Sequence, residues 1–208
     1  MAINKTIFTA DRTAQKSEIL SWLQANAADY FDEISEDNNG NIVCSLENGA
    51  KLTFVFDSTA TSYSVESKTG ISHTIGGGSS ASSYTKEGIV TSKGIMIVGN
   101  TTTSAANILI ISKTNADTIS LSMNVRVGSG SSAYPCFMDL INDVDWLTKS
   151  IAPQIFSTPI TSLTPVCFSY GTHCEHVFLT SFTQFENTCI MQINSKKYAY
   201  GGYLALEE

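Results

Sequence analysis

Charged side chains are scarce in this sequence. Asp, Glu, Lys and Arg account for 15% of its 208 residues, against roughly 25% in a typical soluble domain. Serine and threonine take their place, with 27 and 23 residues, so hydroxyl groups rather than charges are expected to cover much of the surface. Such a surface is more typical of extracellular β-proteins and virion proteins than of cytosolic helical enzymes.

Positive charge is especially sparse. The 12 Lys and Arg residues face 19 Asp and Glu, the formal net charge is −7, and no Lys/Arg cluster occurs. Nucleic-acid binding needs cations along the phosphates, so we expect no nucleic-acid partner.

Long apolar runs are also missing. No stretch approaches the roughly 18 apolar residues of a membrane span. The first residues, "MAINKTIFTADR", lack the apolar core of a signal peptide. We therefore expect synthesis in the cytoplasm, no export by the usual route and no membrane insertion.

The cysteines follow no disulfide or metal pattern. Their number is odd and no CxxC occurs. Synthesis in a reducing compartment favours free, mostly buried thiols. The five cysteines are Cys44, Cys136, Cys167, Cys174 and Cys189.

The motifs of common active sites are absent as well. No GxSxG nucleophile elbow, no glycine-rich loop followed by GK[ST] and no patterned calcium loop occurs. We therefore predict no catalytic residue and no cofactor. Two acidic clusters are interpreted as solvated faces, although paired carboxylates for glycoside hydrolysis stay open because a sequence does not show spatial separation. The clusters are Asp29, Asp32, Glu33, Glu36 and Asp37, and Asp139, Asp143 and Asp145.

One short stretch, "GTHCEHVFL", concentrates potential metal ligands: His173, Cys174, Glu175 and His176. Zinc takes about four N or S ligands in a tetrahedron. Alternation along a strand, however, would put Cys174 and His176 on one face and the other two on the opposite face. We interpret the stretch as a turn entering a sheet and predict no metal site, with His173, Cys174 and His176 as the candidates should a metal bind.

The same stretch offers a Cys–His pair for nucleophilic catalysis, with Cys174 or Cys167 as nucleophile and His176 or His73 as base. Such chemistry needs an activated thiol and a base within hydrogen-bond reach. Nothing local in the sequence supplies either, so we do not predict it.

Segment 1–28 contains the clearest helix. Asp11 or Thr13 can cap it, and Leu20, Leu23 and Ala27 recur at helical spacing in "AQKSEILSWLQANAA". The apolar stripe is expected to dock on the body of the protein. Pairing with a neighbouring subunit is the alternative.

From residue 29 the apolar period becomes two. Runs such as "NIVCSLE" and "KLTFVFD" alternate, with turn signals such as "NG" (Asn48, Gly49) between them. Strands that recur roughly every 8–12 residues indicate an antiparallel sandwich or barrel.

We predict one mainly-β domain, 1–208, built as an antiparallel β-sandwich or barrel-like meander with an N-terminal helix and one short accessory helix. Residues 29–126 form the first β-meander and 153–208 a C-terminal β segment. Between them, 127–152 hold a loop and a short helix in "FMDLINDVDWLTKSI", where Leu140, Val144 and Leu147 fall at helical spacing. Two small-residue stretches, "IGGGSSASSYTKEG" (75–88) and "VGSGSSAYP" (127–135), are predicted to be exposed loops.

Tyrosines gather near the C-terminus in "YAYGGY", which holds Tyr198, Tyr200 and Tyr203. Exposed tyrosines can stack on sugars or build an interface, so these three are the ligand or interface candidates. A half-buried terminal strand is the alternative, and we favour it.

The ending "EHVFLTSFTQFENTCIMQINSKKYAYGGYLALEE" places a short apolar strand before the hairpin "INSKKYAY" and the final "GGYLALEE". It resembles the end of small tail-associated structural proteins encoded by phages and prophages of gram-positive gut bacteria. The resemblance covers most of the chain in layout and the last thirty or so residues in detail. It implies a virion or contractile-tail component, repeated by symmetry, at the baseplate or fibre end.

The first hypothesis is therefore a non-enzymatic virion structural protein that takes part in host-surface attachment. It would be located in the virion, with further copies of itself, other virion proteins and a host-surface glycan as partners. The second hypothesis is a carbohydrate-binding β-sandwich module, and the third is a hydrolase of cell-surface polymer.

Overall fold

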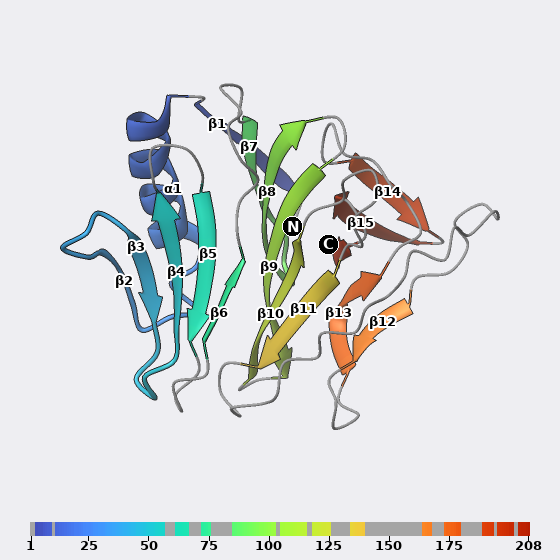
Figure 1. The fold of residues 1–208 in the computed structure, drawn as a ribbon. Coiled ribbons are helices and arrows are strands. Elements are labelled where there is room, and N and C mark those ends of the chain that lie inside the picture. The colour runs from blue at the N-terminus through green and yellow to red at the C-terminus, as the bar shows by residue number, and fades with distance from the viewer. Residues whose placement is uncertain are drawn as a thin grey trace.

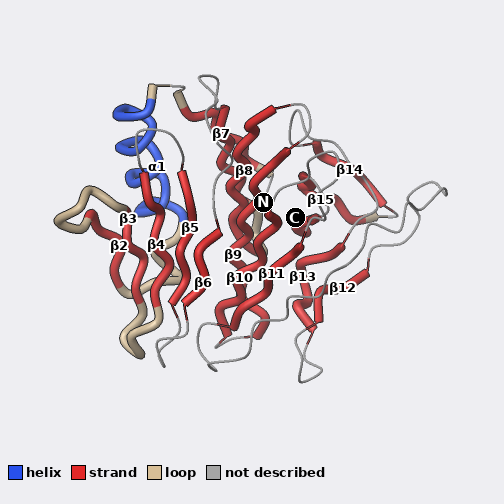
Figure 2. Tube along the Cα trace, in the orientation of Figure 1, coloured by secondary structure: helices blue, strands red, loops and turns tan. Residues whose placement is uncertain are grey.

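The computed structural model describes residues 3–9, 11–56, 61–66, 72–75, 85–102, 105–115, 118–125, 134–139, 164–167, 173–179, 189–193, 195–201 and 204–208. Within these ranges the chain forms one α-helix and sixteen strands, and the strands make three antiparallel sheets (Figures 1 and 2). The predicted mainly-β class is confirmed. The sheets stack in three layers, an arrangement that the sequence did not predict.

The central sheet has six strands. Consecutive strands β7 to β11 lie side by side as a meander, and β1 joins the free side of β7 although the two are distant in sequence. Its order is β1 (Asn4–Phe8), β7 (Thr85–Val90), β8 (Gly94–Thr102), β9 (Ala105–Asn115), β10 (Thr118–Val125) and β11 (Tyr134–Asp139).

The N-terminal sheet is a five-stranded meander of neighbours in sequence. Two of its turns carry glycines with positive φ, Gly40 at 78° and Gly49 at 89°, and the second lies in the turn predicted from "NG". Its order is β2 (Glu33–Glu36), β3 (Ile42–Ser45), β4 (Lys51–Phe56), β5 (Thr61–Glu66) and β6 (Ser72–Ile75).

The C-terminal sheet also has five strands, but their spatial order departs from their order in sequence. The last strand, β16, lies in the middle of the sheet, between β13 and β15. The order is β12 (Thr164–Cys167), β13 (His173–Leu179), β16 (Leu204–Glu207), β15 (Lys196–Gly201) and β14 (Cys189–Ile193).

The central sheet is covered on both faces. Ile95, Ile97, Leu109 and Ile111 point to one face and join a buried cluster with the N-terminal sheet and the helix. Alternate residues point to the other face, where a Cβ on Gly94 would meet the Leu206 side chain of the C-terminal sheet at 3.2 Å. Figure 1 shows the three layers side by side, with the central sheet in the middle.

Helix α1 (Arg12–Asn26) confirms the predicted N-terminal helix. Asp11 is the N-cap, and its side chain accepts a hydrogen bond from the Ala14 backbone N–H at 2.9 Å. The apolar stripe is buried within the chain itself, since Ile19 and Leu23 are fully covered. The docking predicted for this stripe is therefore confirmed. Among the described residues, no helix has the length and apolar character needed to cross a bilayer.

Three loop and helix predictions need correction. Tyr134 and Pro135, the end of the loop predicted at 127–135, belong to β11, where they pair with β10. Phe137 to Asp139, the start of the predicted accessory helix, belong to β11, where pairing with β10 decides the conformation. The remainder, with Leu140, Val144 and Leu147, lies outside the described residues. In the stretch predicted as an exposed loop at 75–88, Ile75 ends β6, and Thr85 to Gly88 begin β7. Gly88 is buried there.

Candidate functional site

The three metal candidates all lie on one strand. His173, Cys174 and His176 belong to β13, which begins at His173. Among the described residues, no group of three or more His, Cys, Asp or Glu side chains is placed to hold a metal ion.

His176 instead takes part in a polar cluster that joins three adjacent strands. The Glu207 carboxylate, from β16, lies 2.6 Å from Lys196 Nζ of β15 and 3.5 Å from His176 Nδ1 of β13. The Glu207 side chain is only 10% exposed. The sequence did not predict this cluster, because it depends on β16 entering the sheet between β13 and β15.

The charge of Glu207 is stabilised by its neighbours. Burial alone would raise the pKa of this carboxyl, but the hydrogen bond and positive charge of Lys196, with a smaller contribution from the nearby His176, lower the pKa below its usual value. The hydrogen bond to Glu207 likewise raises the pKa of Lys196. The cluster therefore holds an ionised carboxylate at neutral pH.

Tyr198 lies beside this cluster, in register with Glu207 on the neighbouring strand. Its ring packs edge-to-face on Phe178 with centroids 5.6 Å apart, and only 6% of the residue is exposed. Burial raises the pKa of its hydroxyl. Tyr198 is therefore a packed strand residue. Its burial agrees better with the favoured alternative, a half-buried terminal strand, than with an exposed ligand-binding surface. Tyr200 is in β15, and Tyr203 lies outside the described residues.

Cys44 is a structural thiol. It is fully buried in the cluster between the helix, the N-terminal sheet and the central sheet, and it is free. Burial raises its pKa to about 12. A thiol that stays protonated at neutral pH is a poor nucleophile, so Cys44 is a core residue.

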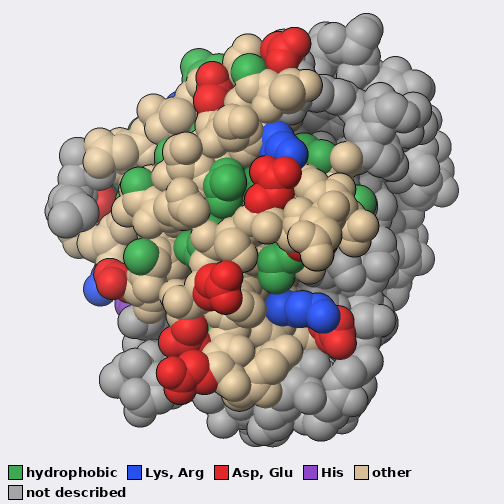
Figure 3. All heavy atoms as spheres, turned by 90° about the vertical axis from the view of Figure 1, so that its left-hand side faces the viewer, with side chains coloured by type: hydrophobic (Ala, Val, Ile, Leu, Met, Phe, Trp, Pro, Cys, Tyr) green, Lys and Arg blue, Asp and Glu red, His purple; other side chains and the backbone are tan. Residues whose placement is uncertain are grey.

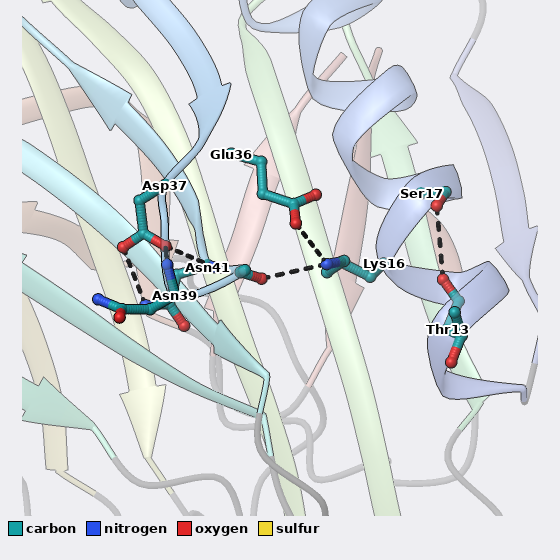
Figure 4. Close-up of polar contacts among 8 residues, drawn as sticks. Thr13, Lys16, Ser17, Glu36, Asp37, Asn39 and Asn41 are labelled. Atoms are coloured by element: carbon teal, nitrogen blue, oxygen red, sulfur yellow. Dashed lines mark hydrogen bonds and ion pairs between the residues drawn. The ribbon is translucent and has the colours of Figure 1, made fainter.

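The first acidic cluster builds a turn. Asp37 Oδ1 accepts hydrogen bonds from the backbone N–H groups of Asn39 and Asn41, each at 2.8 Å (Figure 4). These bonds, above all the one from Asn41, lower the pKa of the Asp37 carboxyl. Lys16 of α1 reaches the same turn and contacts Glu36 Oε1 at 2.7 Å and the Gly40 carbonyl at 3.3 Å.

Of the second acidic cluster, Asp139 lies in β11, while Asp143 and Asp145 are outside the described residues. The N-terminal side of the molecule carries scattered carboxylates and few lysines (Figure 3). The carboxylates of the two acidic clusters that lie in the described residues thus fit a solvated acidic surface better than a paired-carboxylate site.

A second feature lies at the free edge of the central sheet. A shallow open groove of about 520 Å³ runs between β1 and α1, and the side chain of Ile7 is 65% exposed beside it. The groove is lined by Thr6, Ile7 and Phe8 of β1 and by Ser17, Glu18, Ser21 and Trp22 of α1. The run Asn4–Phe8 gave no strand prediction, because its partner β7 begins some eighty residues later, at Thr85.

Comparisons of the chain with protein-family models, with curated proteins and with solved structures found no match.

Proposed function

We propose that this protein is a non-enzymatic structural component of a phage virion tail, at the baseplate or fibre end. It works by associating with copies of itself and with neighbouring virion proteins, and it contributes to attachment at the host surface. The resemblance of the C-terminal segment to tail-associated proteins supports the setting. The Ser/Thr-rich surface with little charge supports the same class.

One observation carries the assembly role. The exposed large hydrophobic residues of the described chain are Ile7, at 65% exposed, and Ile190, at 57%. Ile7 lies on β1 and Ile190 on β14, and each strand is the edge of its sheet. An edge strand presents unpaired backbone N–H and C=O groups, and proteins that stay monomeric usually protect such edges with charges or prolines. An aliphatic side chain on an open edge favours association instead.

The other two hypotheses gain less support. Sugar stacking on Tyr198 would require an exposed ring, and that ring is buried against Phe178. We therefore rank the glycan-binding module and the polymer hydrolase below the assembly role.

Light scattering coupled to size-exclusion chromatography tests the proposal. The purified protein is expected to form an oligomer of defined stoichiometry that dissociates on dilution. A strict monomer at every concentration, together with absence from purified particles, would count against the proposed function. Tail-tube, baseplate or holin genes beside the coding sequence would support the phage setting independently.

A further inference from the structure

We infer that the Asn48–Gly49 turn is a site of spontaneous covalent modification, at which the asparagine side chain loses ammonia and becomes aspartate or isoaspartate. The inference goes beyond the proposed function and does not depend on it. Asparagine followed by glycine reacts most readily, because glycine has no Cβ to shield its backbone nitrogen. The sequence contains two such pairs, Asn39–Gly40 and Asn48–Gly49, and their surroundings in the structure favour the second.

The reaction has two steps. In the first, the Gly49 backbone nitrogen attacks Cγ of Asn48. An N–Cγ bond forms, the Cγ–Nδ2 bond breaks, and the N–H proton leaves with the side-chain nitrogen as ammonia. In the second, water adds its OH to one of the two carbonyl carbons of the cyclic imide and its proton to the ring nitrogen. Opening at the side-chain carbon gives aspartate, and opening at the main-chain carbon gives isoaspartate.

The backbones of the two turns are bonded in the same way. Gly40 N–H donates to the Asp37 carbonyl at 3.0 Å, and Gly49 N–H donates to the Leu46 carbonyl at 2.9 Å. Both glycines have positive φ, 78° and 89°. The attacking nitrogen is therefore held alike in the two turns, and a difference in rate must come from the groups around them.

The backbone N–H two residues after each asparagine has a different acceptor in the two turns. Ala50 N–H donates to Asn48 Oδ1 at 2.9 Å. This bond polarises the carbonyl under attack and stabilises the negative charge that gathers on Oδ1 as the tetrahedral intermediate forms. In the other turn, the corresponding N–H of Asn41 donates to Asp37 Oδ1 at 2.8 Å instead (Figure 4).

Negative charge opposes the reaction at Asn39. Asp37 Oδ1 accepts hydrogen bonds from Asn39 N–H and Asn41 N–H, the residues on both sides of Gly40. These bonds lower the pKa of the Asp37 carboxyl, so the carboxylate is ionised at neutral pH. An anion at this distance disfavours both proton loss from the Gly40 nitrogen and charge on Asn39 Oδ1.

The carboxylate bonded to the other turn is placed differently. Asp32 Oδ2 accepts a hydrogen bond from Glu47 N–H at 2.7 Å. Glu47 precedes Asn48, whereas the Asp37 carboxylate bonds the two residues that flank the reacting glycine. The charge of Asp32 is therefore directed away from the atoms that react.

The space around the two glycines differs in the same sense. A Cβ on Gly49 would meet nothing within 4 Å, whereas a Cβ on Gly40 would lie 3.4 Å from Lys16 Nζ and 3.5 Å from Glu36 Oε1. Lys16 and Glu36 pair with each other at 2.7 Å and join the Gly40 turn to α1. The turn at Gly49 is open to water and has room for the imide ring.

Isoaspartate would change the hairpin of β3 and β4. It continues the main chain through the side-chain carbon, which adds a methylene group between positions 48 and 49. The hydrogen bond from Leu46 N–H to the Ala50 carbonyl, at 2.9 Å, closes this hairpin. The paired residues Cys44 and Leu52 beyond it are fully buried. Modification at Asn48 is therefore expected to loosen an element of the core.

Peptide mapping by mass spectrometry tests the inference. The folded protein is kept at neutral pH for several weeks, conversion of amide to acid is followed in the peptides containing Asn39 and Asn48, and an isoaspartyl methyltransferase assay measures isoaspartate. Asn48 is expected to convert at least about fivefold faster than Asn39, the rate ratio that one hydrogen bond to a carbonyl typically supplies. In protein unfolded by urea the two rates should be similar, because both asparagines precede glycine.

Two variants test the cause. Asp37→Ser keeps a hydrogen-bond acceptor in the turn without the charge, and it should raise the rate at Asn39 toward that at Asn48 while leaving Asn48 unchanged. Asn48→Ser should remove most of the isoaspartate formed by the folded protein. A rate at Asn48 that rises together with that at Asn39 would show that Asp37→Ser has loosened the fold, and Asp37→Asn then replaces it.

Three results would overturn the inference. The first is a rate at Asn39 that equals or exceeds the rate at Asn48 in the folded protein. The second is absence of conversion at Asn48 in the folded protein while both sites convert in urea. The third is a ratio in urea as large as in the folded protein, which would assign the preference to the sequence rather than to the turn.

Discussion

At the scale of single residues, Gly88 shows how tightly the central sheet is packed. A Cβ built on Gly88 would lie 2.7 Å from Trp22 Cε2 and 2.8 Å from Phe8 Cζ. Both distances are shorter than real side-chain contacts. The absence of a side chain at this position therefore leaves room for the Trp22 and Phe8 rings to pack against β7, which helps to hold α1 and β1 in place.

We predict that Gly88→Ala lowers the free energy of unfolding by about 1–3 kcal/mol, because the added methyl group displaces both rings. Urea denaturation followed by tryptophan fluorescence measures the change. Gly49→Ala is the control. Nothing lies within 4 Å of a Cβ built on Gly49, but its φ is +89°. Backbone strain alone should therefore lower the free energy of unfolding by about 1 kcal/mol. A Gly88→Ala/Trp22→Ala double variant should lose less than the sum of the single losses. Strict additivity would contradict the proposed clash.

The sequence was informative about residues whose role is local. The cap at Asp11 and the turn glycines Gly40 and Gly49 follow from neighbours within a few positions. The environments of His176 and Tyr198 could not be predicted in the same way. They depend on which strands lie beside β13 and β15, and that order is fixed by contacts between distant segments.

At the scale of elements, the cluster around Glu207 joins β13, β15 and β16. Because the folded-state pKa of Glu207 is lowered, its contribution to stability is present above the unfolded value of about 4.3 and is lost as the pH falls through the folded-state pKa. On the alkaline side, the raised pKa of Lys196 keeps the pair intact until the pH rises through that value.

Glu207→Gln should therefore destabilise the protein by about 1 kcal/mol at pH 7, and the difference from the unmodified protein should shrink toward pH 3. Thermal unfolding at a series of pH values measures it. In the control Glu208→Gln, the carboxylate lost is 3.8 Å from an exposed lysine, so little change is expected at any pH. A Glu207→Gln difference that stays constant down to pH 3 would rule out a role for its charge.

The sequence identified α1 and the hairpins of the N-terminal sheet, because helical periodicity, caps and glycine turns are short-range signals. It missed β1, whose five residues are followed directly by the stronger helix pattern. It also extended a helix into Phe137–Asp139, where a helical apolar spacing competes with pairing to β10.

At the scale of the whole molecule, the C-terminal sheet packs on the central sheet through Leu206. This side chain is fully buried and faces Gly94 of β8. We predict that Leu206→Ala costs about 2–5 kcal/mol, since it leaves a cavity between two layers. Denaturation monitored by hydrogen exchange would show the loss first in the C-terminal sheet. Ile190→Ala removes an exposed aliphatic side chain from the same sheet and should change stability by less than about 0.5 kcal/mol. Equal losses in the two variants would contradict this packing.

One feature of the sequence indicates that the central sheet is covered on both faces. Residues 95–98 and 109–111 are consecutive apolar residues, and all of them are buried. Continuous rather than alternating apolar runs indicate a strand covered on both faces. The identity of the covering layers was not accessible, because it depends on the order of strands across the whole chain.

The position of β1 has a consequence for the time course of folding. Its residues 4–8 pair with residues 86–90, so the chain leaves the central sheet after β1, forms α1 and the N-terminal sheet, and returns beside the strand it left. Closing such a long loop adds little to the equilibrium cost but slows the search for the contact. We expect the local hairpins β7–β11 to form early and β1 to dock late. The edge proposed for association would then appear only once the rest of the subunit is folded, so that nascent and partly folded chains are kept from joining a growing assembly.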